Sequence, residues 1–289
     1  MQGGMGRTPA IQPGGTMSEP MEKRFLTPIE TTQLICDNGR RILTQPASRT
    51  WVLSLLAGFY IAFGAELATL VTADAAEHFG FGMSRVLGGS VFSLGLMLVV
   101  ICGAELFTGN SLLTKAALHG QIPWHKIAEN WTIVIFGNLA GSLFLAWLMV
   151  ASELWVMGGV AEHAVNIAAA KCALPFGVAL VRGILCNWLV CLAVFMATSA
   201  RDIPGKMLAC YVPIMAFVAS GFEHSVANMY FIPTGLLLKS KLDLVVPGLT
   251  WTNFFVGNLL PVTLGNIFGG AIFVGFAYWF AYLRGTRNA

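Results

Sequence analysis

Charge is the scarcest feature of this 289-residue sequence. Only 11% of the residues are Asp, Glu, Lys or Arg, whereas a soluble globular domain carries about 25%. So few charges, in a chain that is 56% hydrophobic, exclude an ordinary soluble protein and give no reason to expect a nucleic-acid partner. Most of the exterior is therefore predicted to face a lipid bilayer.

Signatures of several functional classes are also missing. The six cysteines are scattered without a C-x-x-C pair, so neither a disulfide framework nor a zinc cluster is favoured. The chain has no G-x-S-x-G, H-E-x-x-H or P-loop motif, and we therefore expect no enzymatic activity and no cofactor. Polar residues precede the first hydrophobic segment at Trp51, so a cleavable signal peptide is not expected.

Long apolar windows are what the sequence has instead. A helix that crosses the hydrocarbon core needs about 20 mostly apolar residues. Six windows meet this rule, at about residues 51–72, 86–107, 130–151, 176–199, 207–238 and 253–283. The predicted fold class is an all-α multi-pass membrane protein with six transmembrane helices.

The polar region before these windows divides in two. Residues 1–26 predict a disordered tail, and residues 27–289 a single transmembrane domain. Thr27-Pro28-Ile29-Glu30 is a capping box with Pro at the first helical position, which predicts an amphipathic helix over residues 28–45 at the inner membrane surface. With the N-terminus inside, twelve Lys and Arg residues fall in inner gaps and four in outer gaps, so both termini are predicted to be cytoplasmic.

Two motifs occur twice, three spans apart. The pattern G-x-E-x-x-x-small-N occupies residues 103–110 and 221–228, and G-N-aliphatic-x-G-small occupies residues 137–142 and 265–270. Because three is odd, the two halves must insert with opposite orientation, as inverted repeats. Helices two and five are expected to be interrupted over residues 103–112 and 219–234, and the paired glycines are interpreted as close helix packing.

Two glutamates inside the spans admit two interpretations. Glu105 and Glu223 could form an ion or proton site, because an intramembrane carboxylate is costly unless it has a role. Alternatively, each accepts hydrogen bonds from backbone N–H groups freed by the interruption, with Asn110 and Asn228 completing the set. Their presence in both halves favours the structural interpretation.

His224 marks the point where the halves differ, because its counterpart is Leu106. The other four histidines are expected in polar connections, so His224 is the histidine predicted to lie in a span. An imidazole on an interrupted helix favours a pore group that donates a hydrogen bond or a proton to a small anion. Thr108 on the other interruption is its natural partner, unless it only caps the following helix.

Two cations are expected near the outer end of the fourth span. Lys171 and Arg182 could draw anions into an outer vestibule, or they could pair with Glu153 or Glu162. Both interpretations stay open on the sequence alone.

Four stretches resemble the formate/nitrite transporter family: CGAELFTGN (102–110), KCALPFGVALVRGILCNWLVCLAVF (171–195), ASGFEHSVANMYFIPTG (219–235) and NLLPVTLGNIFGG (258–270). The resemblance runs along about residues 27–284. It implies an aquaporin-like protomer with helices two and five interrupted, assembled as a homopentamer with one pore per protomer.

The resemblance also implies roles for single residues. The central polar pair and a further pore-lining group would be Thr108, His224 and Asn266. The apolar constrictions would be Leu96, Leu106 and Phe217. The vestibule lysine and the polar network around the histidine would be Lys171, Asn187, Glu223 and Asn228.

The function expected from these observations is a pore for formate, nitrite or both across the cytoplasmic membrane. The anion would take a proton near His224 and cross as the neutral acid. One alternative is the same fold conducting hydrosulfide, short monocarboxylates or a neutral solute. Another is an intramembrane enzyme using His224 with Ser225, although adjacent residues of a continuous helix point about 100° apart.

Overall fold

The computed structural model describes residues 25–156 and 159–285, so the predicted tail over residues 1–26 lies almost wholly outside the described residues. Within these ranges the regular structure is helical, apart from one antiparallel bridge between Phe25 and Ala200. Six segments are long and apolar enough to cross a membrane. They are α2 (Ala47–Thr72), α3 with α4 (Ala75–Phe92 and Leu94–Cys102), α6 (Trp124–Ala151), α8 (Phe176–Ser199), α9 (Ile203–Ser220) and the run Asn253–Tyr282.

The last of these segments and the remaining elements complete the order. The run Asn253–Tyr282 consists of η3 (Asn253–Leu259), α11 (Leu260–Gly270), η4 (Ala271–Phe276) and α12 (Ala277–Tyr282). The shorter elements are η1 (Gly109–Leu113), α5 (Thr114–Leu118), η2 (Leu154–Val156), α7 (Val160–Cys172) and α10 (Ser225–Lys241).

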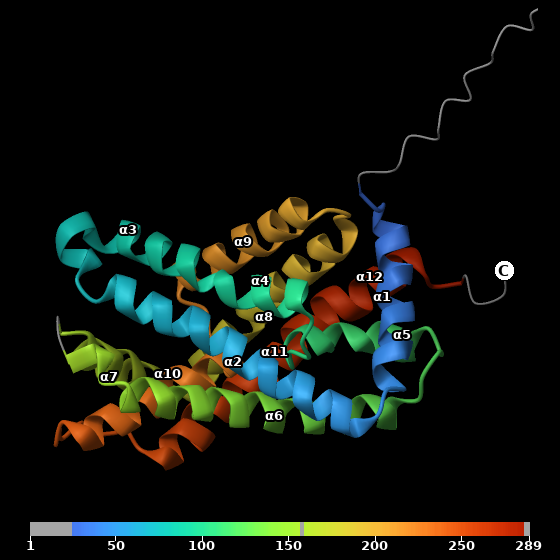
Figure 1. The fold of residues 1–289 in the computed structure, drawn as a ribbon. Helices are drawn as coiled ribbons and strands as arrows, with labels where there is room; N and C mark the ends of the chain where they lie inside the picture. Colours follow the sequence, from blue (N-terminus) through green and yellow to red (C-terminus); the bar gives the residue numbers. More distant parts are fainter. Residues whose placement is uncertain (1–24, 157–158, 286–289) are drawn as a thin grey trace, which may run out of the picture.

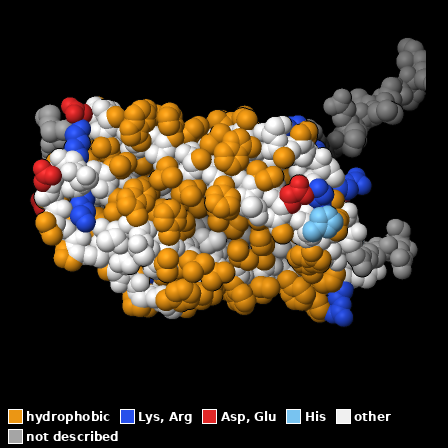
Figure 2. Space-filling model, turned by 90° about the horizontal axis from the view of Figure 1, so that it is seen from below, with side chains coloured by type: hydrophobic (Ala, Val, Ile, Leu, Met, Phe, Trp, Pro, Cys, Tyr) orange, Lys and Arg blue, Asp and Glu red, His pale blue; other side chains and the backbone are white. Residues whose placement is uncertain are grey.

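A hydrophobic band covers the middle of one face of the bundle. Figure 2 shows apolar side chains across the central part of one face, with charged side chains gathered at the two ends. Large apolar side chains of the predicted spans, such as Phe136, Trp147 and Val256, are more than half exposed, which is unfavourable in water and favourable in lipid. The band agrees with an integral membrane protein.

A helix lies across one end of the bundle, and another lies at the opposite end (Figure 1). The first is α1 (Pro28–Leu43), and its predicted capping box is confirmed: Thr27 N donates to the Glu30 carboxylate at 2.8 Å, and Glu30 N donates to Thr27 Oγ1 at 3.4 Å. The helix ends two residues before the predicted limit, because Pro46 disfavours helical backbone at the residue before it. At the other end lies α7.

Positive backbone φ angles end two of the helices inside the bundle. After α4 the chain turns at Gly103, with φ of 79°, and regular structure resumes at Gly109. After α9 it turns at Gly221, with φ of 78°, and α10 begins at Ser225. The apolar window 207–238 is therefore two helices, and only glycine adopts the joining conformation without strain.

Glycines let two pairs of helices cross at close range. A Cβ atom added at Gly141 would lie against the backbone oxygen of Leu55, on the crossing of α2 with α6. One added at Gly265 would lie against the backbone oxygen of Leu180 and 3.0 Å from Ile184 N, on the crossing of α8 with α11. The interpretation of these glycines as packing residues is confirmed.

The expectation that four histidines lie in polar connections was wrong for His125, which belongs to the first turn of α6. His78 lies before a break in α3 at Gly80, where φ is 77°, so it precedes the continuous part of that span. Polar first turns of such helices project beyond the hydrocarbon, so hydrophobicity alone placed their starts too late.

Candidate functional site

Two cavities enter the bundle from its opposite ends. The cavity near α1, here the α1-side cavity, has a volume of about 640 Å³ and is lined in part by Arg41, Arg49 and Glu105. The cavity near α7, here the α7-side cavity, has a volume of about 400 Å³ and is lined in part by Lys171 and His224. Both are therefore cavities with cationic side chains in their walls.

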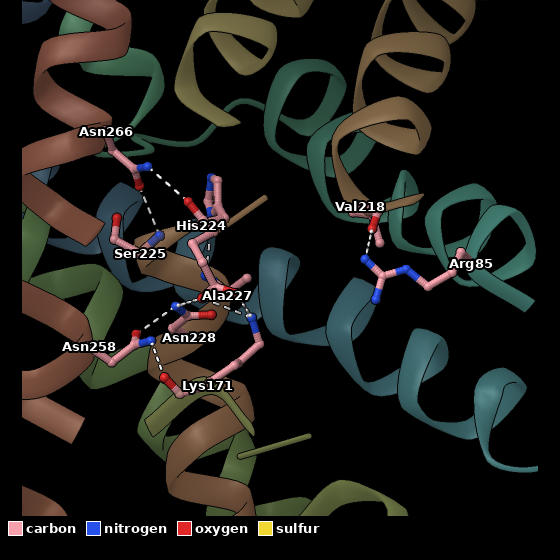
Figure 3. Close-up of polar contacts among 10 residues, drawn as sticks. Arg85, Lys171, Val218, His224, Ser225, Ala227, Asn228, Asn258 and Asn266 are labelled. Carbon is pink, nitrogen blue, oxygen red and sulfur yellow. Dashed lines mark hydrogen bonds and ion pairs between the residues drawn. The ribbon is translucent and has the colours of Figure 1, made fainter. Parts of the chain in front are cut away.

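The predicted central pair is brought together between these cavities. His224 Nε2 lies 3.0 Å from Thr108 Oγ1, and both residues are buried. His224 Nδ1 accepts a hydrogen bond from Ala227 N at 3.0 Å, which caps the N-terminus of α10 (Figure 3). Because Nδ1 accepts, the neutral ring carries its proton on Nε2 and donates it to Thr108.

Apolar side chains lie on both sides of this pair. Phe217 stacks on the His224 ring with centroids 5.9 Å apart and lines the α7-side cavity. Leu96 and Leu106 are buried and line the α1-side cavity. The three side chains predicted as constrictions therefore lie in the walls of the cavities next to the polar pair, and His224 itself lines the α7-side cavity.

An ion pair anchors the polar network on the α7 side. Lys171 Nζ lies 3.0 and 3.1 Å from the two carboxylate oxygens of Glu223. Asn228 Nδ2 donates to Glu223 at 2.7 Å and to Asn258 at 2.7 Å, and Asn258 Nδ2 donates to the Lys171 backbone oxygen at 2.9 Å (Figure 3). The alternative that Lys171 pairs with Glu153 was wrong, because Glu153 binds Lys241 at 2.8 Å.

The α1 side carries a matching network with one difference. Asn110 Nδ2 donates to Glu105 at 2.7 Å and to Asn130 at 3.0 Å. The remaining donor to Glu105 is Gln45 Nε2 at 3.2 Å, where the other half has Lys171. The donors to both carboxylates are side chains, so the expectation of freed backbone N–H donors was wrong.

Those freed backbone groups are satisfied by two other asparagines. Asn266 Oδ1 accepts from Ser225 N at 2.9 Å, while its Nδ2 donates to Gly183 O at 2.8 Å and Glu223 O at 3.0 Å. Asn138 makes the equivalent bonds to Phe107 N, Ser54 O and Glu105 O. Asn266 was expected in the pore lining, and the structure places it fully buried, lining neither cavity.

Asn187 also lies beneath the central pair. Its Nδ2 donates to Thr108 O at 3.1 Å and to Asn266 O at 2.6 Å, and the side chain is fully buried. It holds the backbone of Thr108 against α11 without lining a cavity.

Replacing Asn266 with alanine should lower the melting temperature of the detergent-purified protein by several degrees. Three buried backbone groups would lose their partner, and each unsatisfied group costs about 1–3 kcal/mol. Thermal denaturation of Asn266→Ala beside Asn138→Ala, its counterpart, measures this. An unchanged melting temperature for Asn266→Ala would contradict it.

Sequence reasoning missed three side chains of the α7-side cavity or left them unassigned. Arg85 donates to Ala219 O at 3.0 Å and to Val218 O at 3.1 Å, which caps the C-terminus of α9 (Figure 3). Arg182 also lines the cavity. His163 lies 2.9 Å from Thr72 Oγ1, and burial lowers the pKa of its imidazole, so the ring is neutral at pH 7.

The missed cations had a signal in the sequence. Arg85 lies near the start of a membrane helix whose apolar window was placed too late, so it was counted only as one of the basic residues of the outer gaps.

Within the described residues, no group of three or more His, Cys, Asp or Glu is placed to hold a metal ion.

Comparison with known proteins places this site in a family. A sequence profile of the formate/nitrite transporter family matches residues 29–280. The probable formate transporter of Methanothermobacter thermautotrophicus is 41% identical, covering 91% of this chain and 100% of its own length. The formate channel FocA of Escherichia coli strain K12 is 38% identical, covering 90% and 95%.

Solved structures agree with the sequence matches. A pentameric formate channel with formate bound superposes with a TM-score of 0.72 and 38% identity, covering 82% of this chain and 98% of that one. An FNT family ion channel superposes with a TM-score of 0.78 and 32% identity, covering 87% and 98%. These relatives are channels and transporters and not enzymes, and the chain belongs to the formate/nitrite transporter family.

Proposed function

We propose that this protein is a homopentameric channel that carries formate, and also nitrite, across the cytoplasmic membrane in a pH-dependent way. The observation that carries the proposal is the buried His224–Thr108 pair between two cation-lined cavities. Formate and the pentamer are supported by what the relatives are called. Nitrite is supported by its similar size, charge and shape.

The proposed protomer contains two inverted repeats with interrupted second and fifth membrane helices, as in an aquaporin. Matched hydrogen bonds support this, since Asn138 and Asn266 bind equivalent backbone groups, and Asn110 and Asn228 equivalent carboxylates. The count of basic residues supports cytoplasmic termini, with the α1-side cavity inside and the α7-side cavity outside.

In the proposed mechanism, desolvation and His224 act together. An anion drawn by the cations of the α7-side cavity meets Phe217, where loss of water disfavours its charge and raises its affinity for a proton. Nε2–H of His224 can turn from Thr108 to the anion as a hydrogen-bond donor. The neutral ring can give that proton to the anion only if Nδ1 takes up a proton from the water of the α7-side cavity, which displaces Ala227 N.

A competition flux assay tests the substrate class. Protein in sealed vesicles should take up labelled formate, nitrite should compete with it, and uptake should rise as the external pH falls. Hydrosulfide and lactate serve as the competing alternatives. Uptake of a neutral solute with no formate uptake would contradict the proposal.

Replacing Lys171 with glutamine should lower formate uptake at least about tenfold. The Glu223 carboxylate would lose its cation in a buried position, and breaking such a pair costs about 3–5 kcal/mol. The double variant Lys171→Gln/Glu223→Gln should recover part of the flux, because it also removes the buried carboxylate that lost its cation. Undiminished uptake by the single variant would contradict a role for Lys171.

A further inference from the structure

Arg182 is a cation of the α7-side cavity to which the mechanism above gives no binding role of its own. It lies on α8, half-buried, and among the described residues its guanidinium group has no hydrogen-bond or ion-pair partner. Its backbone oxygen accepts from Glu223 N at 3.2 Å, which fixes Arg182 beside the turn that carries His224. Five unused N–H donors therefore reach the wall of this cavity.

The neighbouring cations are already engaged. Lys171 is neutralised by both oxygens of Glu223 and also lies over the ring of Phe231, 5.3 Å from its centroid. Arg85 donates hydrogen bonds through Nε and Nη2 to backbone oxygens of α9, so its Nη1 is left to bind an anion. Arg182 is thus the cation of this cavity with a full donor set to offer.

Arg85 and Arg182 both line the α7-side cavity. Two like charges in a half-buried cavity repel each other, and an anion between them replaces repulsion by attraction. A guanidinium group binds a planar two-oxygen anion through two parallel hydrogen bonds, which a single-atom anion such as chloride cannot accept.

We propose that Arg182, with Nη1 of Arg85, forms a binding subsite for small planar oxyanions at the α7-side entrance. The subsite rests on the proposed function for its place in transport, and it adds selectivity: formate and nitrite are held there before they reach His224, whereas chloride and hydrosulfide are not. Lys171 supplies only the local field.

Two substitutions separate charge from geometry. Arg182→Lys keeps the positive charge and loses the planar pair of donors, whereas Arg182→Leu loses both. Lys241→Gln is the matched control, because Lys241 lies on the same side of the molecule, pairs with Glu153 and lines neither cavity. Each variant is assayed for competition of nitrite and of chloride against labelled formate in vesicles.

We expect the preference for nitrite over chloride to fall about tenfold in Arg182→Lys, with the dependence on ionic strength kept. In Arg182→Leu the nitrite preference and the dependence on ionic strength should both be lost. The formate concentration that gives half-maximal uptake should rise at least tenfold. Lys241→Gln should match the wild type. An unchanged nitrite preference in a folded Arg182→Lys protein would overturn the subsite.

A second measurement does not depend on flux. Formate and nitrite should raise the melting temperature of the detergent-purified wild type more than chloride does at equal ionic strength, and this difference should vanish in Arg182→Lys. If vesicles show no formate flux but formate and nitrite still raise the melting temperature more than chloride does, the proposed function is overturned and the subsite stands. Flux without the difference would overturn the subsite alone.

Discussion

Replacing His224 with alanine is expected to abolish pH-coupled uptake of formate into vesicles. The substitution removes the donor that faces Thr108 between the apolar side chains of Phe217 and Leu106. A desolvated anion at this position would then have no N–H group to lower the cost of losing its water. We expect the remaining uptake to be close to that of empty vesicles.

The same substitution also removes a helix cap, and a second variant separates the two effects. Asparagine is among the best N-cap residues, so His224→Asn can still accept from Ala227 N, but its shorter side chain does not reach Thr108. Thermal denaturation should place His224→Asn close to the wild type, with His224→Ala about 1 kcal/mol less stable. Both should lack pH-coupled uptake.

Two further variants serve as controls, one at the exposed His78 and one at Thr108, the hydrogen-bond partner of His224. His78 lies near the start of α3 beside Asp74, at a largely exposed position, so His78→Ala should transport as the wild type does. Thr108→Val keeps the shape of the partner and loses its hydroxyl group, and should lower uptake partly. Normal pH-dependent flux through both His224 variants would rule out the role of this histidine.

The helix bounds were predictable where an apolar window is flanked by a proline or by polar residues. The window 176–199 matches α8 at both ends, because Pro175 precedes it and polar residues follow it. Windows two and three began late, since α6 starts with a polar helical turn and α3 starts with a short polar segment before its break at Gly80. Hydrophobicity reports where lipid begins, which is not where the helix begins.

The site was predictable only in part, for a similar reason. The repeated Glu and Asn motifs could be found because they are local patterns, and so could His224, which has no histidine counterpart in the first repeat. Asn130 and Asn258 were missed, since each is a single polar residue in an apolar helix whose partner lies 20 or more residues away. Asn138 belongs to the repeated G-N motif, but its hydrogen bonds to the interrupted backbone were not predicted. Buried hydrogen bonds of this kind depend on tertiary contact and leave no local spacing.

The ion-pair partner of Lys171 is a second case in which a contact depends on the fold. The residues alone offered Glu153 and Glu162 as partners, whereas the family resemblance grouped Lys171 with Glu223. The observed partner, Glu223, is 52 residues away. The placement of the turn after α9 beside the end of α7 brings these two residues together.

Replacing Gly265 with valine is expected to prevent stable folding. Its Cβ would meet the backbone oxygen of Leu180, with Ile184 N at 3.0 Å and Gly183 Cα at 3.1 Å, so the side chain can only be accommodated if α8 and α11 move apart. That movement would break the bonds from Asn266 to Gly183 and Glu223, one residue along α11. Overpacking costs about 1–3 kcal/mol, and the lost hydrogen bonds add to it.

Gly177 provides the matched control, because it lies on α8, the helix against which Gly265 packs, and a Cβ there meets no atom within 4 Å. Gel filtration and thermal denaturation of Gly177→Val in detergent should give a monodisperse protein with nearly the wild-type melting temperature. Gly265→Val should aggregate, and Gly265→Ala should lie between them. Equal behaviour of the two valine variants would mean that close backbone contact between α8 and α11 does not hold the turn of His224 in place.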